Sequence, residues 1–367
     1  MTITSLRITN FRNLAAINLA LNPNGICIID GQNASGKTSL LEAIYCLGIG
    51  RSFRSSLISS LIRQSTSKFS IFAQIMSDHA YSLSLGIEKG LNGSLKMRLA
   101  ERDLTNMVEL ANHLPIRTIH SQSYQLLEGS PLFRRKYLDW GLFYHYEGFL
   151  SAWRHYERAL KQRNSILREK CSKNELEAWT HEIIKYGLIL DKFRQEYVQR
   201  LSPFITSISQ HLLMLDGLEI IYLSGWNESM DYASVLSNSY QDDYRLGYTQ
   251  FGPHRAELLL TFNAVPAKLF LSRGQQKLLI CAMILAQGFL LKQDTNKGLI
   301  YLIDDLPSEL DRQNRSKLLA LLVAQQAQTF ITTIERKDIC ECLDHIHQTT
   351  VKVFHVEQGC IAEIVGA

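Results

Sequence analysis

The sequence has no hydrophobic run long enough to cross a bilayer and no cleavable apolar segment near its N-terminus. A membrane-spanning helix needs about 20 mostly apolar residues, and a signal peptide needs a charged stretch followed by an apolar one. Low-complexity tracts, long runs of like charge and internal repeats are also missing. We therefore expect a cytoplasmic globular protein with no membrane association and no fused transporter domain.

Cysteine is scarce, with seven residues in 367. Their odd number and their scatter through apolar segments argue against a disulfide framework and for reduced thiols in a cytosolic protein. Cys340 and Cys342 are followed by His345 and His347, and all four are residue types that bind zinc. Their spacing does not match a zinc finger, so we interpret them as ordinary residues rather than as a metal cluster.

Charge is nearly balanced, with a net charge of +4 and an isoelectric point near 8.6. This mild basicity is compatible with a nucleic-acid partner without requiring one. The hydrophobic fraction of 46% and the charged fraction of 20% are ordinary for a globular protein, and the length exceeds that of most single domains.

The most informative stretch is residues 31–38, GQNASGKT, which match the phosphate-binding pattern G-x-x-x-x-G-K-[ST]. Residues 25–30 form a short apolar run typical of a buried strand, and residues 39–47 have apolar residues at helical spacing. Glycines let the loop wrap an anion closely, and the following helix N-terminus favours negative charge. The pattern predicts a nucleotide site in which Lys37 reaches the β- and γ-phosphates and the Thr38 hydroxyl binds Mg²⁺. The alternative is a glycine-rich turn that matches by accident.

A second apolar strand is predicted at residues 298–303 and ends in two aspartates. A P-loop ATPase uses an aspartate at this place to help hold Mg²⁺, which assigns that role to Asp304. Asp305 follows directly and is placed to act as the general base that orients the attacking water. The alternative is a polar strand end that caps the next helix.

The spacing of apolar residues divides the chain into three parts. Residues 1–130 and 246–367 alternate strands with helices, and we assign them to the N-terminal and C-terminal parts of an α/β head. Residues 131–245 read as a helical lobe, in which two long helices at 132–170 and 175–215 form an antiparallel hairpin with a break or kink at Pro203. Strand-like alternation resumes from residue 248, around FGPHRAE.

Several segments together resemble the RecF family of SMC-like ABC ATPases. They are ITNFRNL, GQNASGKTSLLEAIY, GRSFR, QLLEGSPLFRRKYLDWG, FGPHRAEL, LSRGQQKLL and LIDDLPSELD, and they occur in family order over nearly the whole chain. The resemblance implies an α/β fold, an ABC-type, SMC-like P-loop ATPase head with an inserted helical lobe. It further implies an ATP-dependent DNA-binding protein of recombinational repair and replication restart, acting as an ATP-driven homodimeric clamp that helps load recombinase at gapped DNA. Implied partners are single- and double-stranded DNA through backbone contacts, together with RecR and RecO.

The same resemblance implies roles for individual residues. Nucleotide contacts fall on Arg12, Asn13, Gly31, Asn33, Ala34, Ser35, Gly36, Lys37, Thr38 and Ser39. The segment at 271–277, LSRGQQK, is similar to the ABC signature, so Ser272, Arg273, Gly274 and Gln275 are expected to meet the γ-phosphate bound by the partner subunit. Residues 308–311 correspond to the D-loop, Thr332 and Thr333 to the switch position, and Gln122 falls near the Q-loop. Asp305 replaces the glutamate common in the superfamily, and its shorter side chain leads us to expect slow ATP hydrolysis.

Basic residues gather at Arg51 and Arg54, which flank Phe53, and along the predicted helices at Arg134, Arg135, Lys136, Arg154, Arg158, Lys161, Arg163 and Arg168. Composition alone describes a solvated helix face, whereas the family resemblance favours a surface that neutralises DNA phosphates. Two rival functions remain open. The ATPase subunit of an ABC transporter would share the signature but not the helical lobe or ITNFRNL, and a metabolic P-loop kinase would have no signature.

Overall fold

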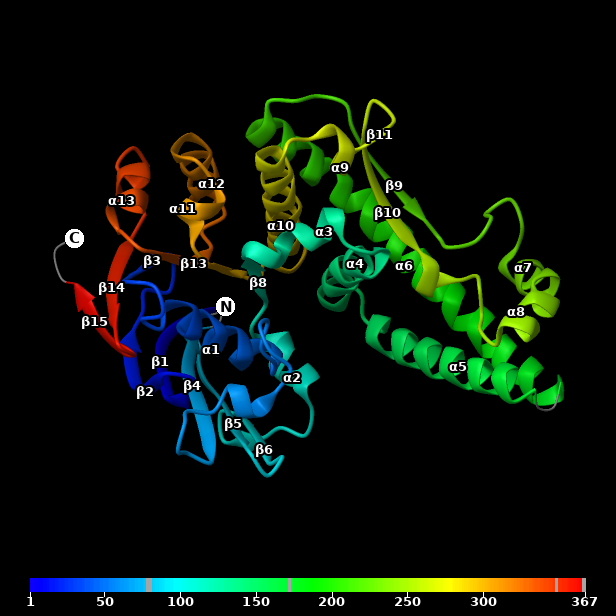
Figure 1. Cartoon of the computed structure of the whole chain (residues 1–367), viewed down its shortest axis with the longest axis horizontal. Coiled ribbons are helices and arrows are strands. Elements are labelled where there is room, and N and C mark those ends of the chain that lie inside the picture. Colours follow the sequence, from blue (N-terminus) through cyan, green and yellow to red (C-terminus); the bar gives the residue numbers. More distant parts are fainter. Residues whose placement is uncertain (77–80, 171–172, 347–348, 365–367) are drawn as a thin grey trace. The chain divides into compact units, whose positions relative to one another are not determined.

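The computed structural model describes residues 1–76, 81–170, 173–346 and 349–364 (Figure 1). The chain forms two compact units. Met1–Ser123 with Lys277–Ala367 make up one, which we call the head, and Tyr124–Gln276 make up the other, which we call the helical unit. An α/β head interrupted by a largely helical insertion is thus confirmed. The helical unit also includes residues 246–276, which the sequence analysis assigned to the head.

The head contains a largely parallel sheet in the order β15-β14-β3-β13-β12-β8. Its strands are β3 (Gly25–Asp30), β8 (Ile116–Ile119), β12 (Ile300–Ile303), β13 (Gln328–Thr333), β14 (Val351–Glu357) and the antiparallel edge strand β15 (Cys360–Ile364). The strand that precedes the P-loop, β3, lies between two strands from the far end of the chain. Because these strands are parallel, their carboxyl ends meet at one edge of the sheet, where ligands bind in open α/β folds.

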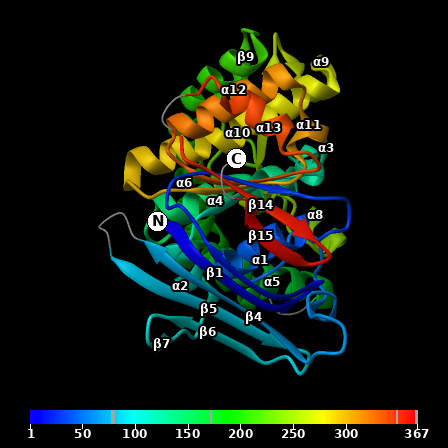
Figure 2. The same cartoon turned by 90° about the vertical axis from the view of Figure 1, so that its left-hand side faces the viewer.

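A second sheet in the head is antiparallel and has the order β2-β1-β4-β5-β6-β7 (Figure 2). Its strands are β1 (Thr2–Phe11), β2 (Leu14–Ala20), β4 (Lys68–Met76), β5 (Ser82–Gly90), β6 (Leu95–Leu99) and β7 (Arg102–Asp103). The alternation at residues 68–99 predicted three of these strands correctly. It did not show that the first two strands of the chain complete the same sheet.

Helix α1 (Lys37–Ile49) contacts strands of both sheets in the head. Leu40, Leu41 and Ile44 are at most 1% exposed, so this helix begins at the P-loop and is anchored in the core. The head also contains α2 (Met107–His113), α11 (Leu306–Glu309), α12 (Arg312–Ala324) and α13 (Lys337–Leu343). Figure 1 shows α12 and α13 on one side of the parallel strands and α1 on the other.

Helix α10 (Arg273–Thr295) begins in the helical unit and continues through the head. The sequence analysis expected no segment able to cross a membrane, yet by length and composition α10 is apolar enough to do so; 78% of its most apolar stretch is buried inside the protein. Leu279, Leu285 and Leu291 are completely buried. The hydrophobicity of α10 is therefore accounted for by packing in the core.

The helical unit differs from the predicted hairpin of two long helices. It contains α3 (Gln125–Glu128), α4 (Pro131–His145), α5 (Phe149–Glu169), α6 (Lys173–Leu213), α7 (Tyr232–Asn238), α8 (Tyr240–Leu246) and α9 (Ala267–Phe270). The expected first helix is divided into α4 and α5 at Gly148, whose φ of 88° is incompatible with a continuous helix. Of the break or kink expected at Pro203, a break does not occur, because α6 continues through this residue. The predicted pairing is confirmed between α5 and α6.

A small sheet of β9 (Leu218–Leu223), β10 (Glu257–Phe262) and β11 (Val265–Pro266) completes the helical unit. The sequence analysis missed β9. It also expected strand-like alternation from residue 248 around FGPHRAE, whereas Pro253–Arg255 form a single 3₁₀ turn and β10 begins only at Glu257. Two contacts hold this turn in place, one to α5 and one to the loop that precedes the turn. His254 Nδ1 lies 2.7 Å from the Tyr156 hydroxyl, and His254 Nε2 lies 3.0 Å from the carbonyl oxygen of Thr249.

The environment of His254 predicts a pH-dependent stability. Burial lowers the pKa of His254 to about 4, against 6.5 for an exposed histidine. The unfolded chain therefore binds a proton between these two pH values and the folded chain does not, so the free energy of unfolding falls as the pH is lowered from 6.5, by up to about 3 kcal/mol. A His254→Gln variant keeps one donor and one acceptor, and its thermal unfolding should lose less stability than wild type between pH 7 and 4.5. Equal losses in the two proteins would contradict this prediction.

Candidate nucleotide-binding site

The P-loop runs directly from the buried strand β3 into α1. Gly31 and Gly36 have φ angles of 148° and 124°, which side-chain-bearing residues rarely adopt. A Cβ at Gly31 would lie 2.3 Å from the carbonyl oxygen of Val356, and one at Gly36 would lie 2.9 Å from Asn13 Nδ2. Both glycines are therefore required by backbone conformation and by close packing.

Lys37 is held at the P-loop by two backbone acceptors. Its Nζ donates to the carbonyl oxygens of Gly31 at 2.6 Å and Gln32 at 2.9 Å. Burial lowers the pKa of Lys37, and the nearby carboxylates of Asp305, Asp304 and Asp30 oppose that shift. The ammonium is thus positioned next to a loop that can bind phosphate, whose charged oxygens are stronger acceptors than carbonyls.

Asp304 follows β12 and is held by two hydroxyl groups. Thr38 Oγ1 donates to its Oδ1 and Oδ2 at 2.9 and 3.1 Å, and Thr332 Oγ1 donates to Oδ1 at 2.8 Å. The predicted magnesium ligands Thr38 and Asp304 are therefore in direct contact. A carboxylate beside a hydroxyl supplies the hard oxygen ligands that Mg²⁺ prefers.

Asp305 has a left-handed backbone conformation, with φ 53° and ψ 54°. Its N–H donates to Thr332 Oγ1 at 2.7 Å, and its carbonyl oxygen accepts from the Ser308 N–H and hydroxyl at 3.0 and 2.9 Å. Aspartate enters this conformation more readily than most residues. The hydrogen bonds on both sides of the residue fix the direction in which its carboxylate leaves the backbone.

These groups border one cavity of about 530 Å³, a volume suited to a small-molecule ligand. Its lining consists of Asn13, Asn33, Ala34, Gly36, Lys37, Thr38, Ser39, Arg54, Ser121, Asp304, Asp305, Ser308, Glu309 and Thr332. The neighbouring Ser35 hydroxyl is buried without a hydrogen-bond partner among the described residues. The cavity therefore fits a nucleoside triphosphate with Mg²⁺, because it offers a lysine, a glycine-rich loop, a hydroxyl and two carboxylates.

Most residues predicted for the nucleotide site lie together at this cavity, but Arg12 does not line it. Its guanidinium donates to both carboxylate oxygens of Glu42 and to the carbonyl oxygen of Ser60. Glu42 is completely buried, so Arg12 neutralises a carboxylate that has no access to water. Asn13 lines the cavity, donates to the carbonyl oxygen of Ser35 and accepts from Ser39 Oγ.

The sequence analysis did not assign Arg54 and Ser121 to the nucleotide site. Arg54 was grouped with the DNA-binding candidates, yet it lines the cavity and lies 3.9 Å from Glu42. Ser121 lines the cavity where Gln122 was considered, and Gln122 is exposed. Glu309 also lines it and pairs with Lys277 at 2.9 Å. The positive charge of GRSFR, directly after the P-loop helix, was the one signal that pointed to Arg54.

The signature-like segment lies at the start of α10, in the helical unit. The Ser272 N–H donates to Gln275 Oε1 at 2.9 Å, and the Gln275 N–H donates to Ser272 Oγ at 3.4 Å. This reciprocal pair is a capping box. Ser272, Arg273 and Gly274 are exposed, and a Cβ built at Gly274 would meet nothing within 4 Å. The described lining of the cavity comes from the head alone.

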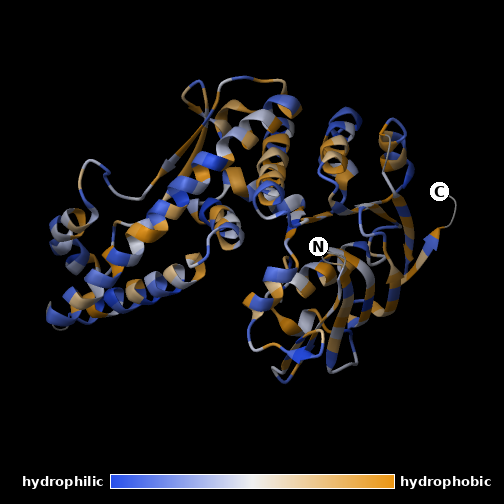
Figure 3. Cartoon of the chain, turned by 180° about the vertical axis from the view of Figure 1, so that it is seen from behind, coloured by the Kyte–Doolittle hydropathy of each residue, from blue (hydrophilic) through white to orange (hydrophobic). Residues whose placement is uncertain are grey.

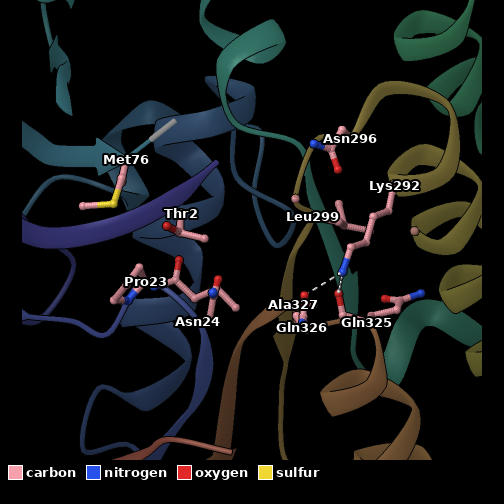
Figure 4. A pocket seen from close by; sticks show the side chains of 13 residues that line it. Thr2, Pro23, Asn24, Met76, Lys292, Asn296, Leu299, Gln325, Gln326 and Ala327 are labelled. Atoms are coloured by element: carbon pink, nitrogen blue, oxygen red, sulfur yellow. Dashed lines mark hydrogen bonds between the residues drawn. The ribbon is translucent and has the colours of Figure 1, made fainter. Parts of the chain in front are cut away.

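A second cavity in the head, of about 340 Å³, lies at the amino ends of the parallel strands (Figure 4). Of the described residues that line it, only Lys292 is charged. Its Nζ donates to the carbonyl oxygen of Gln325 at 2.6 Å and to Gln326 Oε1 at 3.2 Å. The remaining lining is mostly amide and apolar. This cavity lacks the charged oxygen ligands that the P-loop cavity provides.

Two of the arginines proposed for DNA binding have internal roles instead. Arg163 is 1% exposed and donates to Asp243 at 2.8 Å, so it cannot reach DNA. Arg134 donates twice to Glu257, at 2.6 and 2.7 Å. Helix α5 contains both hydrophilic and hydrophobic residues along its length (Figure 3). Four of its basic residues are exposed: Arg154, Arg158, Lys161 and Arg168. Among the described residues no metal-binding group of histidine, cysteine and acidic residues forms, and His347 lies outside them.

A parallel sheet with a P-loop after β3, and an aspartate pair after β12 on the far side of β13, are the features of a P-loop ATPase head. Residues 2–362 match the family described as RecF/RecN/SMC N terminal domain. The chain belongs to the RecF family. It is 39% identical over 363 residues to the DNA replication and repair protein RecF of Cellvibrio japonicus, covering 99% of both chains.

Solved structures agree with this assignment. The chain is similar to the recombination mediator protein RecF-ATPrS in the RecFOR pathway, with 26% identity, a TM-score of 0.87 and coverage of 99% of this chain and 98% of that one. The corresponding RecF-ATP structure gives 25% identity, a TM-score of 0.86 and the same coverage. The family match overturns the rival reading of this chain as an ABC transporter subunit.

Proposed function

We propose that this protein binds and slowly hydrolyses ATP with Mg²⁺, and that ATP assembles it into a homodimeric clamp on DNA. The convergence of Lys37, Thr38, Asp304 and Asp305 on one cavity is the observation that supports this proposal most strongly. The RecF name of its relatives supports a role in DNA replication and repair. The two solved RecF structures, with ATPrS and ATP, support ATP as the nucleotide.

The chemistry follows from the residues around the cavity. The P-loop amides and Lys37 would bind the phosphates, while Thr38 and Asp304 would hold Mg²⁺, which supplies Lewis-acid stabilisation of phosphate charge. The Asp305 carboxylate would orient a water molecule and accept its proton at one Oδ. Thr332 keeps Asp304 and Asp305 in place through two hydrogen bonds. Because aspartate is shorter than glutamate, we expect slow turnover suited to a switch.

Dimerisation is supported by the exposed start of α10. Its capping box leaves Arg273 and Gly274 accessible at a helix N-terminus, which attracts phosphate. A two-fold dimer would bring this segment of each subunit to the nucleotide of its partner, so that each ATP becomes part of the interface. Binding of ATP and dimerisation are then linked by mass action.

DNA contact is assigned to the exposed basic residues of α5. Arg154, Arg158 and Lys161 are spaced four and three residues apart, which places them on one face of the helix, and Arg168 is two turns further on. Such a face neutralises backbone phosphates on single- and double-stranded DNA without reading bases, and its binding weakens as salt rises. The placement of the solved RecF proteins in the RecFOR pathway supports RecR and RecO as partners and loading of recombinase at gapped DNA as the cellular role. We place this activity in the cytoplasm.

A Ser272→Arg substitution tests the clamp. The arginine would put a bulky cation where a close hydroxyl contact is expected, so the variant should bind ATP as a single head with affinity within about twofold of wild type. It should remain monomeric with ATP and Mg²⁺ in sedimentation and should lose the stimulation of ATP hydrolysis by double-stranded DNA that we expect of wild type. Ser207→Arg, on an exposed serine of α6 in the same unit, is the matched control and should behave as wild type. A Ser272→Arg protein that still dimerises with ATP would remove the signature segment from the interface.

A further inference from the structure

The turn between β14 and β15 contacts the P-loop, although more than 300 residues separate the two segments. Gln358 and Gly359 form this two-residue turn with φ angles of 47° and 79°, as in a type I′ hairpin. The Gly359 N–H donates to the carbonyl oxygen of Ser35 at 2.8 Å. The last hairpin of the chain therefore ends on the loop that is expected to bind phosphate.

A second donor reaches the same carbonyl from the other end of the chain. Asn13 Nδ2, in the turn between β1 and β2, donates to the Ser35 carbonyl oxygen at 3.1 Å. In a trans peptide the C=O and N–H point in opposite directions within one rigid plane. Holding the Ser35 carbonyl with two donors therefore also fixes the direction of the Gly36 N–H. Gly36 lines the nucleotide cavity.

The hairpin approaches the P-loop region at further points. The carbonyl oxygen of Val356 packs so closely on Gly31 that a Cβ there would lie 2.3 Å away. His355 Nδ1 lies 2.9 Å from Asp30 Oδ1, directly before the loop. A Cβ at Gly359 would lie 2.3 Å from the carbonyl oxygen of Asn13, so this position of the turn has no room for a side chain. The contact depends on glycine at both Gly31 and Gly359.

We propose that the β14–β15 turn is a positioning element of the phosphate site, in which the Gly359 N–H orients the Ser35–Gly36 peptide so that the Gly36 N–H faces the bound phosphate. This inference rests on the proposed function of the cavity as a nucleotide site. P-loop amides bind the α- and β-phosphates, which nucleoside diphosphates and triphosphates share. Loss of the contact should therefore weaken ADP and ATP binding by the same factor, because the P-loop amides bind the α- and β-phosphates and not the γ-phosphate that ADP lacks.

A Gly359→Ala substitution tests the contact, and Gly93→Ala is its matched control. Gly93, in the β5–β6 turn, has a φ of 80°, almost the same as 79° at Gly359, but a Cβ there would meet nothing within 4 Å. Both variants introduce the same backbone strain, whereas only Gly359→Ala displaces the turn from Asn13 and Ser35. Titration calorimetry should show ADP and ATP affinities about tenfold weaker for Gly359→Ala and unchanged for Gly93→Ala. Affinities within about twofold of wild type for Gly359→Ala would overturn the proposal.

A backbone ester isolates the hydrogen bond itself and decides the matter if Gly359→Ala does not fold. Replacing Gly359 with glycolic acid removes the N–H and adds no side chain, and a synthetic segment from Cys342 onward can carry it by ligation at that cysteine. We expect both nucleotides to bind about fivefold more weakly, whereas unchanged affinities would overturn the proposal. A wild-type chain that binds neither nucleotide would overturn the proposed function and this inference with it. Normal wild-type binding with unaffected variants would overturn the inference alone.

Discussion

Replacing Lys37 with alanine is expected to weaken ATP binding by about 100-fold, because a charge-assisted contact to phosphate is lost. The fold should survive, since Lys37 bonds only to two carbonyl oxygens of its own loop. Burial also lowers the pKa of this ammonium, so the substitution removes a group that is costly to keep charged without a phosphate. Calorimetric titration with ATP and Mg²⁺, combined with circular dichroism, measures both consequences.

Lys292→Ala is the matched control for this experiment. Lys292 also lies in the head and also donates to a backbone carbonyl, at 2.6 Å, but it lines the cavity at the opposite ends of the strands. Its replacement should leave ATP affinity unchanged. A Lys37→Ala protein with native circular dichroism and wild-type ATP affinity would refute the nucleotide site.

Asp305→Asn should lower the rate of ATP hydrolysis by about 100-fold while ATP and Mg²⁺ still bind. Asparagine tolerates the left-handed backbone of this position, so the hydrogen bonds to Thr332 and Ser308 should remain. The amide can no longer accept a proton from water. Single-turnover hydrolysis at saturating ATP separates this loss from any change in binding.

Comparing Asp305→Asn with Glu309→Gln identifies which carboxylate acts as the general base for the attacking water. Glu309 lines the same cavity but pairs with Lys277, which we interpret as a structural contact. Its neutral variant should therefore hydrolyse ATP faster than Asp305→Asn. If Asp305→Asn turns over at the wild-type rate, the base lies elsewhere and Glu309 becomes the next candidate.

Local sequence patterns predicted the parts of the site that depend on neighbouring residues. The strand before the P-loop, the helix after it and the strand ending at Asp304 are each confirmed, because their hydrophobic spacing and turn chemistry are contained in a few residues. The position of Asp304 beside Thr38 then follows from a parallel sheet, whose strands end at the same edge.

Ion pairs between residues that are distant in the chain could not be predicted from local sequence patterns. The family resemblance assigned Arg12 to the nucleotide, and nothing local shows that Glu42, thirty positions later, is buried beside it. Arg163 was grouped with the DNA contacts, and the neighbouring sequence gives no sign of its partner Asp243, which is 80 positions away. A basic residue on a predicted helix has no local mark that distinguishes an exposed charge from a buried, paired one.

The strand order of the parallel sheet has a consequence for how the protein is made. Both neighbours of β3 come from beyond residue 327, so a ribosome has synthesised most of the chain before the P-loop strand can be enclosed. Residues 124–276 form a compact unit that is complete much earlier. During translation, which adds about 5–20 residues per second, the helical unit can therefore fold before β13 and β14, the two strands beside β3, have been synthesised. A chain cut short before β13 would contain the whole P-loop sequence and no enclosed strand to support it.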